Sequence, residues 1–375
     1  MIHFLNKSSK ILATLVLSAI LLACSQDSNT EPETEPLAPG TGIGPARDIS
    51  SFDLVGEMGV GWNLGNSFDV TSSDKTRWGN PLPSKAMIDA VRARGFKTLR
   101  IPVTWGFHQS SQAPYTVDAD YLDRVKAVVD YGFYNRMHVI INVHHDNSWV
   151  VPDASSAEET KARLSSLWTQ VANHFEAYND SLIFETLNEP RLEGIPEEWS
   201  GGTADGRSFV NEFNKTAVNA IRATGGNNAL RHLMIPTWAA STVPDAMNDL
   251  IIPNNDPKII ISLHSYFPWS FAGEAKTAWG SDSDKQALNS ELSRIRQKWI
   301  TEANRPVILG EWGTIEDNDL NSRIEYSTFY ARAAAERGLL TVVWDDGGNF
   351  RMFNRSALSW DYGEIATAIV EAAEN

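Results

Sequence analysis

The chain has 375 residues, and 32 Lys and Arg against 47 Asp and Glu give it a formal net charge of −15 at pH 7. This length allows two or three domains or a single α/β barrel, and an apolar content of 42% excludes a mainly disordered chain. Because so acidic a surface repels phosphate backbones, we expect no nucleic acid among its partners. Cys24 is the one cysteine, which excludes an intramolecular disulfide and a cysteine-based zinc site.

Residues 1–23 have the pattern of a lipoprotein signal peptide. Two lysines precede the uncharged segment 11–23, which is too short to span a bilayer comfortably and has the length of a signal-peptide core. Cys24 follows Leu-Leu-Ala, which resembles a bacterial lipobox, in which the cysteine is lipidated and becomes the mature N-terminus. With Ser25 after it, the pattern predicts a lipid anchor in the outer membrane of the cell envelope. The alternative is an ordinary signal peptide, an incidental cysteine and an extracellular protein.

Residues 24–49 comprise this cysteine and a segment that is polar, acidic and rich in Pro and Gly. Such a composition cannot bury enough apolar surface to fold, so we expect a disordered tether. A Gly-x-Gly-x-Gly run occurs within it, but no strand precedes the run and no helix follows, so it is not a nucleotide-binding loop. We expect one folded domain over residues 50–375.

Beyond residue 50, short apolar runs alternate with amphipathic stretches. Several runs are continuous Val, Ile and Leu, as expected of strands buried on both faces. Between the runs, Ser84 is the predicted N-cap of a helix that stops at Gly95, and residues 288–299 carry four apolar side chains on one helix face. Eight such alternations predict either a doubly wound sheet or a (β/α)8 barrel. The expected strands are 60–64, 98–103, 139–143, 182–187, 232–235, 259–263, 307–309 and 339–343.

Each predicted strand delivers a polar or aromatic residue at or near its carboxyl end. In a barrel these ends converge on one face, whereas a doubly wound sheet concentrates them around one switch point. Because all eight strands carry such a residue, we predict a single (β/α)8 TIM barrel. The residues are Asn66, Arg100, His144 with His145, Asn188 with Glu189, Trp238, His264 with Tyr266, Glu311 and Trp344.

Two of these residues, Glu189 and Glu311, are carboxylates at the ends of apolar strands. A buried carboxylate is costly without partners, so each needs a reason to be there. Pairing with Arg100 explains one of them at most, because the strand ends offer a single arginine at this level. Two carboxylates across a barrel mouth suit glycoside hydrolysis, in which one protonates the leaving oxygen and the other attacks the anomeric carbon or activates water.

Six short motifs follow one another along the predicted strands. They are Gly-Trp-Asn-Leu-Gly-Asn at 61–66, Leu-Arg-Ile-Pro at 99–102, Val-His-His-Asp at 143–146, Asn-Glu-Pro at 188–190, His-Ser-Tyr at 264–266 and Gly-Glu-Trp-Gly at 310–313. The set resembles glycoside hydrolase family 5 over essentially everything from residue 50 onward, and its opening is most similar to the endoglucanase branch. The resemblance implies a monomeric, retaining endo-β-1,4-glucanase that cleaves cellulose or related β-1,4-linked polysaccharides and needs no cofactor.

The resemblance also implies a role for each matched residue. Glu189 is the expected acid/base and Glu311 the expected nucleophile. Asn188 is expected to hydrogen-bond the 2-hydroxyl of the sugar being cleaved, while Arg100 and Tyr266 hold Glu311 ionised and oriented. We expect the charge of Glu311 to raise the pKa of Glu189 toward neutrality.

Six further side chains are implied to contact the substrate or to line its pocket. They are His144 and His145 in the pocket wall, His264 beside the acid/base, Trp344 beneath the reacting sugar, and Asn66 and Asp69 at the next sugar out.

The two adjacent histidines also raise the question of a metal centre. Adjacent residues of a strand point to opposite faces, so His144 and His145 cannot easily bind one ion, and we expect no metal. His138 and His232 stand at strand starts and are expected to be structural.

Tryptophan is abundant, with 13 residues, and seven fall near strand carboxyl ends. Flat rings there match the apolar faces of β-linked glucose, so we expect the seven to line a substrate cleft. Trp168 and Trp299, on predicted helix faces, are expected in the core. The seven are Trp62, Trp105, Trp149, Trp238, Trp269, Trp312 and Trp344.

Two alternatives to a cellulase remain. A xyloglucanase, a lichenase or a β-mannanase on the same scaffold would differ in its loops. A surface protein that binds glycan without cleaving it belongs to another class, but it has no use for Glu189 and Glu311 beside Arg100 and Tyr266.

Overall fold

The computed structural model of the protein describes residues 40–71 and 77–374. The expected signal peptide over 1–23 and the lipidation site Cys24 lie outside these residues. Within them, no helix combines the length and the apolar character needed to cross a bilayer.

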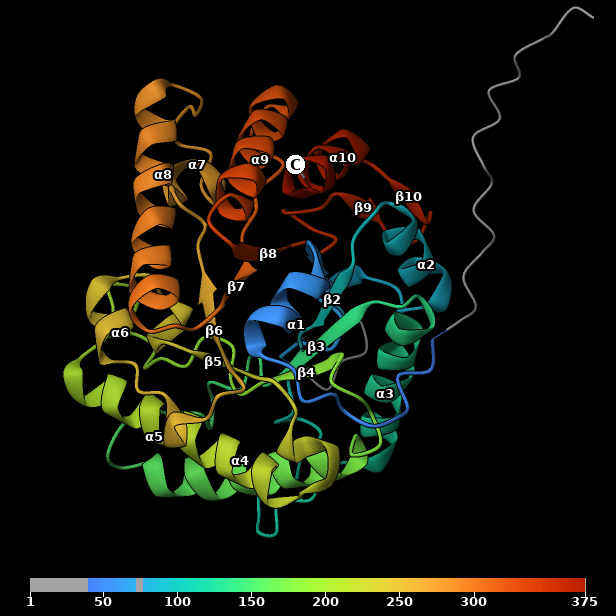
Figure 1. The fold of residues 1–375 in the computed structure, drawn as a ribbon, viewed down its shortest axis with the longest axis vertical. Coiled ribbons are helices and arrows are strands. Elements are labelled where there is room, and N and C mark those ends of the chain that lie inside the picture. The colour runs from blue at the N-terminus through green and yellow to red at the C-terminus, as the bar shows by residue number, and fades with distance from the viewer. Residues whose placement is uncertain (1–39, 72–76, 375) are drawn as a thin grey trace, which may run out of the picture. The chain divides into compact units, whose positions relative to one another are not determined.

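Eight parallel strands close into a barrel in their sequence order, with β1 hydrogen-bonded to β8. Figure 1 shows the helices around the outside of these strands, except the first helix, which lies across one end of the barrel. The closed order confirms the predicted (β/α)8 barrel and excludes the doubly wound sheet, and every predicted apolar run overlaps one strand. The strands are β1 Gly61–Asn63, β2 Thr98–Ile101, β3 His138–Asn142, β4 Leu182–Glu185, β5 Leu233–Pro236, β6 Ile259–His264, β7 Val307–Glu311 and β8 Leu339–Val343.

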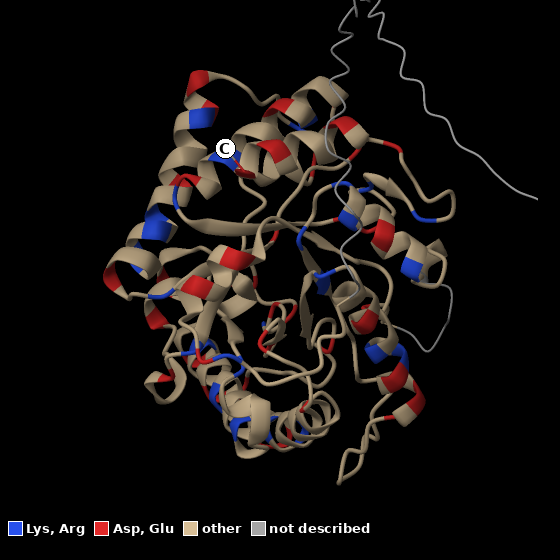
Figure 2. Ribbon diagram, turned by 45° about the vertical axis from the view of Figure 1, so that its right-hand side comes forward, with Lys and Arg blue, Asp and Glu red and all other residues tan. Residues whose placement is uncertain are grey.

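The helices form where caps and apolar faces predict them. Ser84 accepts a hydrogen bond from the backbone N–H of Met87 at the start of α2. Gly95 ends this unit at a φ of +115°, and a Cβ there would lie 2.6 Å from Val370 Cγ1, so glycine is required. Acidic and basic side chains are interspersed along the outer helices (Figure 2). The helices are α1 Ser51–Met58, α2 Lys85–Ala93, α3 Ala119–Tyr134, α4 Ala157–His174, α5 Ala204–Ala223, α6 Pro244–Asp249, α7 Trp269–Ala272, α8 Asp282–Arg296, α9 Leu320–Ala335 and α10 Gly363–Glu374, and a small hairpin pairs β9 Phe353–Asn354 with β10 Ser359–Trp360.

The amino-terminal end of the barrel is closed by its own helix. Leu54, Val55 and Met58 of α1 form one buried cluster with the inward side chains of the strands, such as Ile140 and Ile260. Outward strand residues pack with the helices in a second, larger cluster. Burial on both faces explains the continuous apolar runs of the strands. Since α1 fills the amino-terminal end, the opposite end is the one left for a site.

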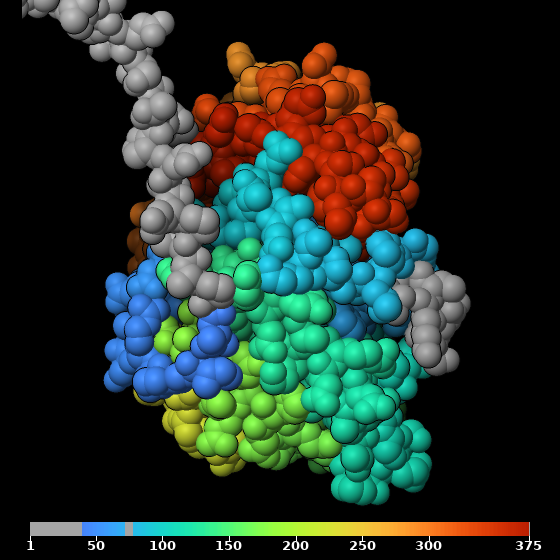
Figure 3. Space-filling view, turned by 90° about the vertical axis from the view of Figure 1, so that its right-hand side faces the viewer, coloured from blue at the N-terminus to red at the C-terminus, as the bar shows by residue number. Residues whose placement is uncertain are grey.

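Residues 40–49 belong to the folded unit, so the tether predicted over 24–49 and the domain start predicted at 50 are wrong for these ten residues. Arg47 bonds Asp180 and Glu57 at 2.6 and 2.8 Å, and Lys258 bonds Asp48 at 2.6 Å. Figure 3 shows this blue segment against green parts of the barrel. The Pro/Gly-rich composition suggested a tether, but specific ion pairs hold the segment where apolar burial cannot.

Candidate active site

The carboxyl ends of the strands bring the predicted polar residues together. Arg100 lies in β2, His264 and Glu311 are the last residues of β6 and β7, and Asn188 with Glu189 follows β4. His264 and Glu311 are register partners across the β6–β7 pair. The site is therefore built on strand ends that the barrel holds rigidly.

Arg100 is the centre of the site, and it is completely buried. Its guanidinium donates to Glu311 Oε1 at 2.8 Å, to Asn188 Oδ1 at 2.7 Å and to Asn63 Oδ1 at 2.9 Å. Its Nε donates to Glu185 Oε2 at 2.8 Å. The rigid fork thus fixes the expected nucleophile and the amide of Asn188 relative to each other, with the Asn188 NH2 group left to present to a sugar.

The second oxygen of Glu311 also accepts a hydrogen bond. The Tyr266 hydroxyl lies 3.1 Å from Oε2. Burial, and then the negative charge of Glu311, raise the pKa of Tyr266 well above its ordinary value, so the phenol stays protonated and donates. Arg100 and Tyr266 thus each bond one oxygen of Glu311 and together fix the orientation of its carboxyl group.

Glu189 is held by a different partner. His264 Nδ1 lies 2.7 Å from Glu189 Oε1 and 3.6 Å from Glu311 Oε2. Burial lowers the pKa of His264, but the charge of Glu311 and the bond to Glu189 outweigh burial and raise it. Burial raises the pKa of Glu189, but the bond to His264 and the charges of His264 and Arg191 outweigh burial and lower it.

The expected rise in the pKa of Glu189 is therefore wrong for the free protein. The imidazole of His264 lies between both carboxylates, so the pKa of His264 is raised while that of Glu189 is lowered. The two groups share one proton as a unit, and this unit is the acid that the site can supply.

The two carboxylates approach each other closely. One oxygen of Glu189, one oxygen of Glu311 and one ring nitrogen of His264 all lie within 4.8 Å of one another. Carboxyl groups roughly 5–5.5 Å apart are typical of retaining glycosidases, whereas inverting enzymes need roughly 6.5–9.5 Å to fit a water. The geometry is that of a nucleophile and an acid/base on one anomeric centre.

A flat wall stands beside the carboxylates. The rings of His144 and Trp344 are parallel, with 5.8 Å between centroids, and His144 Nε2 lies 3.9 Å from Glu311 Oε1. Burial, and then the charge of His145, lower the pKa of His144 well below its ordinary value, so the imidazole is neutral. A Cβ on Gly65 would lie 2.7 Å from the Trp344 ring, so this ring position requires a glycine.

The sequence model of cellulases, glycosyl hydrolase family 5, matches residues 61–349. The chain belongs to glycosyl hydrolase family 5. It is 46% identical over 345 residues to endoglucanase B of Clostridium cellulovorans, a match that covers 89% of this chain and 77% of the relative.

Solved structures of the family are also similar. The protein named ZgEngAGH5_4, in complex with a cellotriose, is 50% identical with a TM-score of 0.86, and the match covers 87% of this chain and all of that one. A broad-specificity endoglucanase from Clostridium acetobutylicum is 45% identical with a TM-score of 0.84, over 86% of this chain and all of that one.

Asp69 does not have the exposure that its expected sugar contact requires. It is fully buried, and its two oxygens accept the backbone N–H groups of Asn66 at 2.9 Å and Ser67 at 2.7 Å. Burial raises its pKa to about 6 despite these bonds. Asp69 therefore shapes the loop after β1, where Asn66 has a φ of +51° and stays half-buried.

His144 and His145 do not lie on opposite faces of a strand, as the sequence analysis expected of them. Strand β3 ends at Asn142, so strand alternation does not reach His144 and His145, and their ring centroids lie 4.3 Å apart. Together with Asp69 they bring three ligand atoms within 4.8 Å. Both Asp69 oxygens are already bonded to backbone and His144 Nδ1 lies 3.1 Å from Asn142 Nδ2, so we assign the cluster to the pocket wall of this family 5 site.

Four of the seven tryptophans predicted at the cleft are core residues. Trp62, Trp105, Trp238 and Trp312 are at most 1% exposed, because their rings pack between strands and helices. Trp168 and Trp299 are in the core as predicted. Position near a strand end does not reveal on which side of the strand a ring lies. Three tryptophans with at least half of their surface exposed are Trp78, Trp199 and Trp269, of which the sequence analysis singled out only the last.

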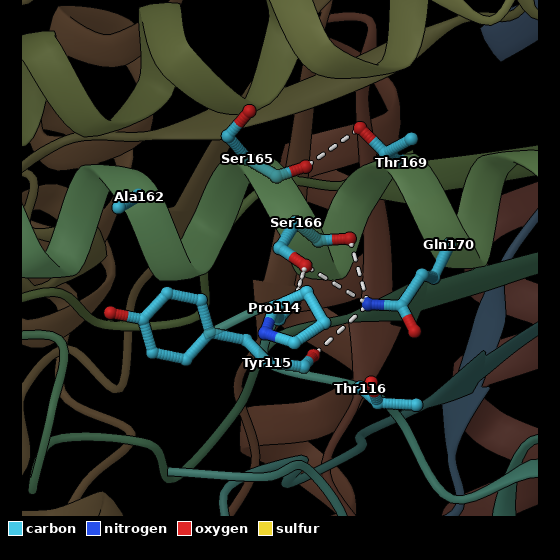
Figure 4. Close-up of a pocket in the computed structure, with 8 residues that line it drawn as sticks. All are labelled: Pro114, Tyr115, Thr116, Ala162, Ser165, Ser166, Thr169 and Gln170. Carbon is cyan, nitrogen blue, oxygen red and sulfur yellow. Dashed lines mark hydrogen bonds between the residues drawn. The ribbon is translucent and has the colours of Figure 1, made fainter. Parts of the chain in front are cut away.

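A shallow pocket outside this site lies against the outer face of α4 (Figure 4). Its polar groups bond one another: Ser166 Oγ donates to the Pro114 carbonyl, and Gln170 donates to the Tyr115 carbonyl at 3.0 Å. No charged side chain lines it, and we assign it no ligand.

Glu185 is a site residue that the sequence analysis missed. It ends β4, is fully buried, and accepts from Arg100, from Asn142 Nδ2 at 2.9 Å and from the Ser262 hydroxyl. A signal was available, since a carboxylate inside the strand Leu182–Glu185 needs a buried cation, and Arg100 is on the next strand but one. The carboxylate of Glu185 therefore balances the charge of the buried Arg100.

We expect Glu185→Gln to reduce kcat by about 10- to 100-fold with KM within about twofold, because the arginine fork would shift under the nucleophile. Ser262→Ala, which removes one bond to Glu185 but keeps its charge, is the matched control and should lose far less. Initial rates on a soluble β-glucan, with thermal unfolding to check the fold, measure both. An unchanged kcat in Glu185→Gln would show that Arg100 does not depend on this carboxylate.

Proposed function

We propose that this family 5 hydrolase is a retaining endo-β-1,4-glucanase, which cleaves internal bonds of cellulose or related β-glucans by a double displacement. The observation that supports this most is the close pair Glu189 and Glu311, each with its own partners, at the open end of the barrel. The names of the relatives, endoglucanases, and the cellotriose in one similar structure support a β-glucan substrate.

In the first step, Glu311 attacks the anomeric carbon and forms an ester while the glycosidic bond breaks. The electron pair of that bond leaves with the aglycone oxygen, which takes the proton held by the Glu189–His264 pair. Arg100 and Tyr266 need not move, because they already hold Glu311 in place.

In the second step, a water attacks the same carbon from the face that the aglycone left, and Glu189 takes a proton from this water. The ester bond to Glu311 breaks, and its electron pair returns to the Glu311 carboxylate. Ester formation has by then removed the Glu311 charge that raises the pKa of His264, so the Glu189–His264 pair, which gave its proton to the aglycone, favours its deprotonated form. Two inversions give net retention, so the first product is the β-anomer.

Exposed aromatic rings support a polymeric substrate. Trp269 is 53% exposed and packs edge-on against Tyr266, with 5.9 Å between centroids, so it stands next to the nucleophile. An exposed flat ring beside the reacting centre can stack on a glucose unit of a chain that extends beyond it. A glycan-binding protein without activity would gain nothing from the bonds that orient Glu311.

Assays of the purified domain on carboxymethyl-cellulose, mixed-linkage glucan, xyloglucan and glucomannan test the proposed substrate. We expect a rapid fall in viscosity on the first, as internal cleavage requires, and the β-anomer as the first product by NMR. Cleavage of xyloglucan or glucomannan alone would instead assign one of those substrates. An α-anomer appearing first would contradict the retaining mechanism.

The two carboxylates should fail differently when truncated. Glu311→Ala removes the nucleophile, so turnover of every substrate should be lost. Glu189→Ala removes proton assistance, which is worth about 10²–10⁴-fold on cellulose. An aryl glycoside with an acidic phenol needs no proton to leave, so Glu189→Ala should still form the glycosyl-enzyme from it. Rapid-mixing measurements of phenol release then show a burst.

Azide completes this test, because it replaces water without needing a base. It should restore turnover of the aryl glycoside in Glu189→Ala and give the β-glycosyl azide. An α-azide from Glu311→Ala, with no rescue of Glu189→Ala, would mean that the two roles are reversed.

We further propose that the protein is a monomer anchored at the cell envelope by lipid on Cys24. Cys24→Ala should then move from the membrane fraction to the soluble periplasmic or extracellular fraction, because two or three acyl chains hold stably and none remains. Fractionation, with mass spectrometry of the mature N-terminus, measures this. A variant that stays with the membrane, or a mature N-terminus without lipid, would contradict the anchor.

A further inference from the structure

Arg191 stands next to the acid/base on the side away from His264. We propose that Arg191 is a positioning residue that favours the carboxylate form of Glu189 for the second, hydrolytic step. The proposal rests on the proposed retaining mechanism and adds a residue to it. No motif in the sequence marks Arg191 as part of the site.

The two oxygens of Glu189 face two different cations. His264 Nδ1 lies 2.7 Å from Oε1, and Arg191 Nη1 lies 3.7 Å from Oε2. The same Nη1 donates to the backbone carbonyl of Glu189 at 3.1 Å, which fixes the guanidinium relative to the carboxylate without a direct side-chain bond. Oε2 therefore feels the charge of Arg191 but stays available to a leaving oxygen or a water.

The guanidinium is held in this position from the outside. Its Nε donates to Glu198 Oε1 at 3.0 Å, and Glu198 Oε2 accepts the backbone N–H of Gly194 at 2.8 Å. The ring of Trp199 covers it, with 4.3 Å from the guanidinium carbon to the ring centroid. Only 11% of the Arg191 side chain is exposed, so water screens its charge weakly.

Other charges also act on Glu189, and their balance differs between the two steps of the reaction. His264 from β6, His145 after β3 and Arg191 favour its carboxylate, and Glu311 from β7 is the negative charge across the mouth. In the first step the Glu311 anion opposes Arg191 and helps the Glu189–His264 pair to hold its proton. The ester is neutral, so in the second step Arg191 acts unopposed and favours the base.

The test is the pH profile of Arg191→Gln. Loss of the cation should raise the apparent pKa of the Glu189–His264 pair, so the alkaline limb of kcat/KM on a soluble β-glucan should move up by about 0.5–1 pH unit. With an aryl cellobioside whose second step is rate-limiting, the acidic limb of kcat should also move up, because a pair with a higher pKa forms its carboxylate only at a higher pH.

Two further variants test the direction of these shifts. Arg191→Lys keeps the charge and should return both limbs toward those of the wild type. Glu198→Gln leaves an acceptor for the loop but removes the nearer of two anions that offset Arg191, so both limbs should move down. The other anion, Glu193, lies 3.4 Å from Arg191 Nη2 and stays in place. If Arg191→Gln proves unfolded by thermal melting, the downward shift in Glu198→Gln still decides the proposal.

Arg207→Gln is the matched control, because Arg207 is 12% exposed and pairs with Asp249 at 2.7 Å in an ion pair that excludes Glu189. The limbs of the pH profile of Arg207→Gln should not move. Unshifted limbs in folded, active Arg191→Gln and Glu198→Gln, or equal shifts in Arg207→Gln, would overturn the role of Arg191. Failure of the retaining mechanism is a different result, since the wild type itself would then release the α-anomer first.

Discussion

The active site depends on one buried cation. Arg100 has no exposed surface and bonds two carboxylates, Glu185 and Glu311. Removing such a cation from water costs several kcal/mol, which only well-placed partners offset. Each guanidinium nitrogen of Arg100 donates a hydrogen bond to a side chain of the site. The positions of Glu311 and Asn188 therefore follow from the position of β2, which carries Arg100. Any loss among these partners would leave a buried charge uncompensated.

Around this centre, two chemically identical side chains acquire different properties from their neighbours. Glu311 receives a guanidinium and a phenol, neither of which gives up a proton near neutral pH. Glu189 receives His264, which can give up a proton, and faces Arg191 at a longer distance. The division between nucleophile and acid/base is thus a division between fixed and exchangeable donors.

Buried polar side chains join the loops above the barrel to one another. Arg355 donates to the Gly65 carbonyl and to the Asp345 carbonyl, and so joins the loop after β1 to the loop after β8. Asp69 bonds the backbone N–H groups of the first of these loops, and Trp344 begins the second. This support places the Trp344 ring beside the carboxylates and explains why Asp69 is buried rather than in contact with substrate.

Local patterns in the sequence determined the eight strands, the caps of helices such as α2 and the order of the motifs, because these depend on residues close along the chain. Only the tertiary structure decided which partner each buried charge receives. Glu185 balances the charge of Arg100 from a strand two places away, and Arg47 holds a segment whose composition resembles a tether. The contact with His264 lowers the pKa of Glu189, which the sequence analysis expected to be raised. It also decided that Trp62 and Trp312 face the core. Burial and Coulomb interactions depend on distances in space, and residues far apart in sequence set those distances only when the barrel closes.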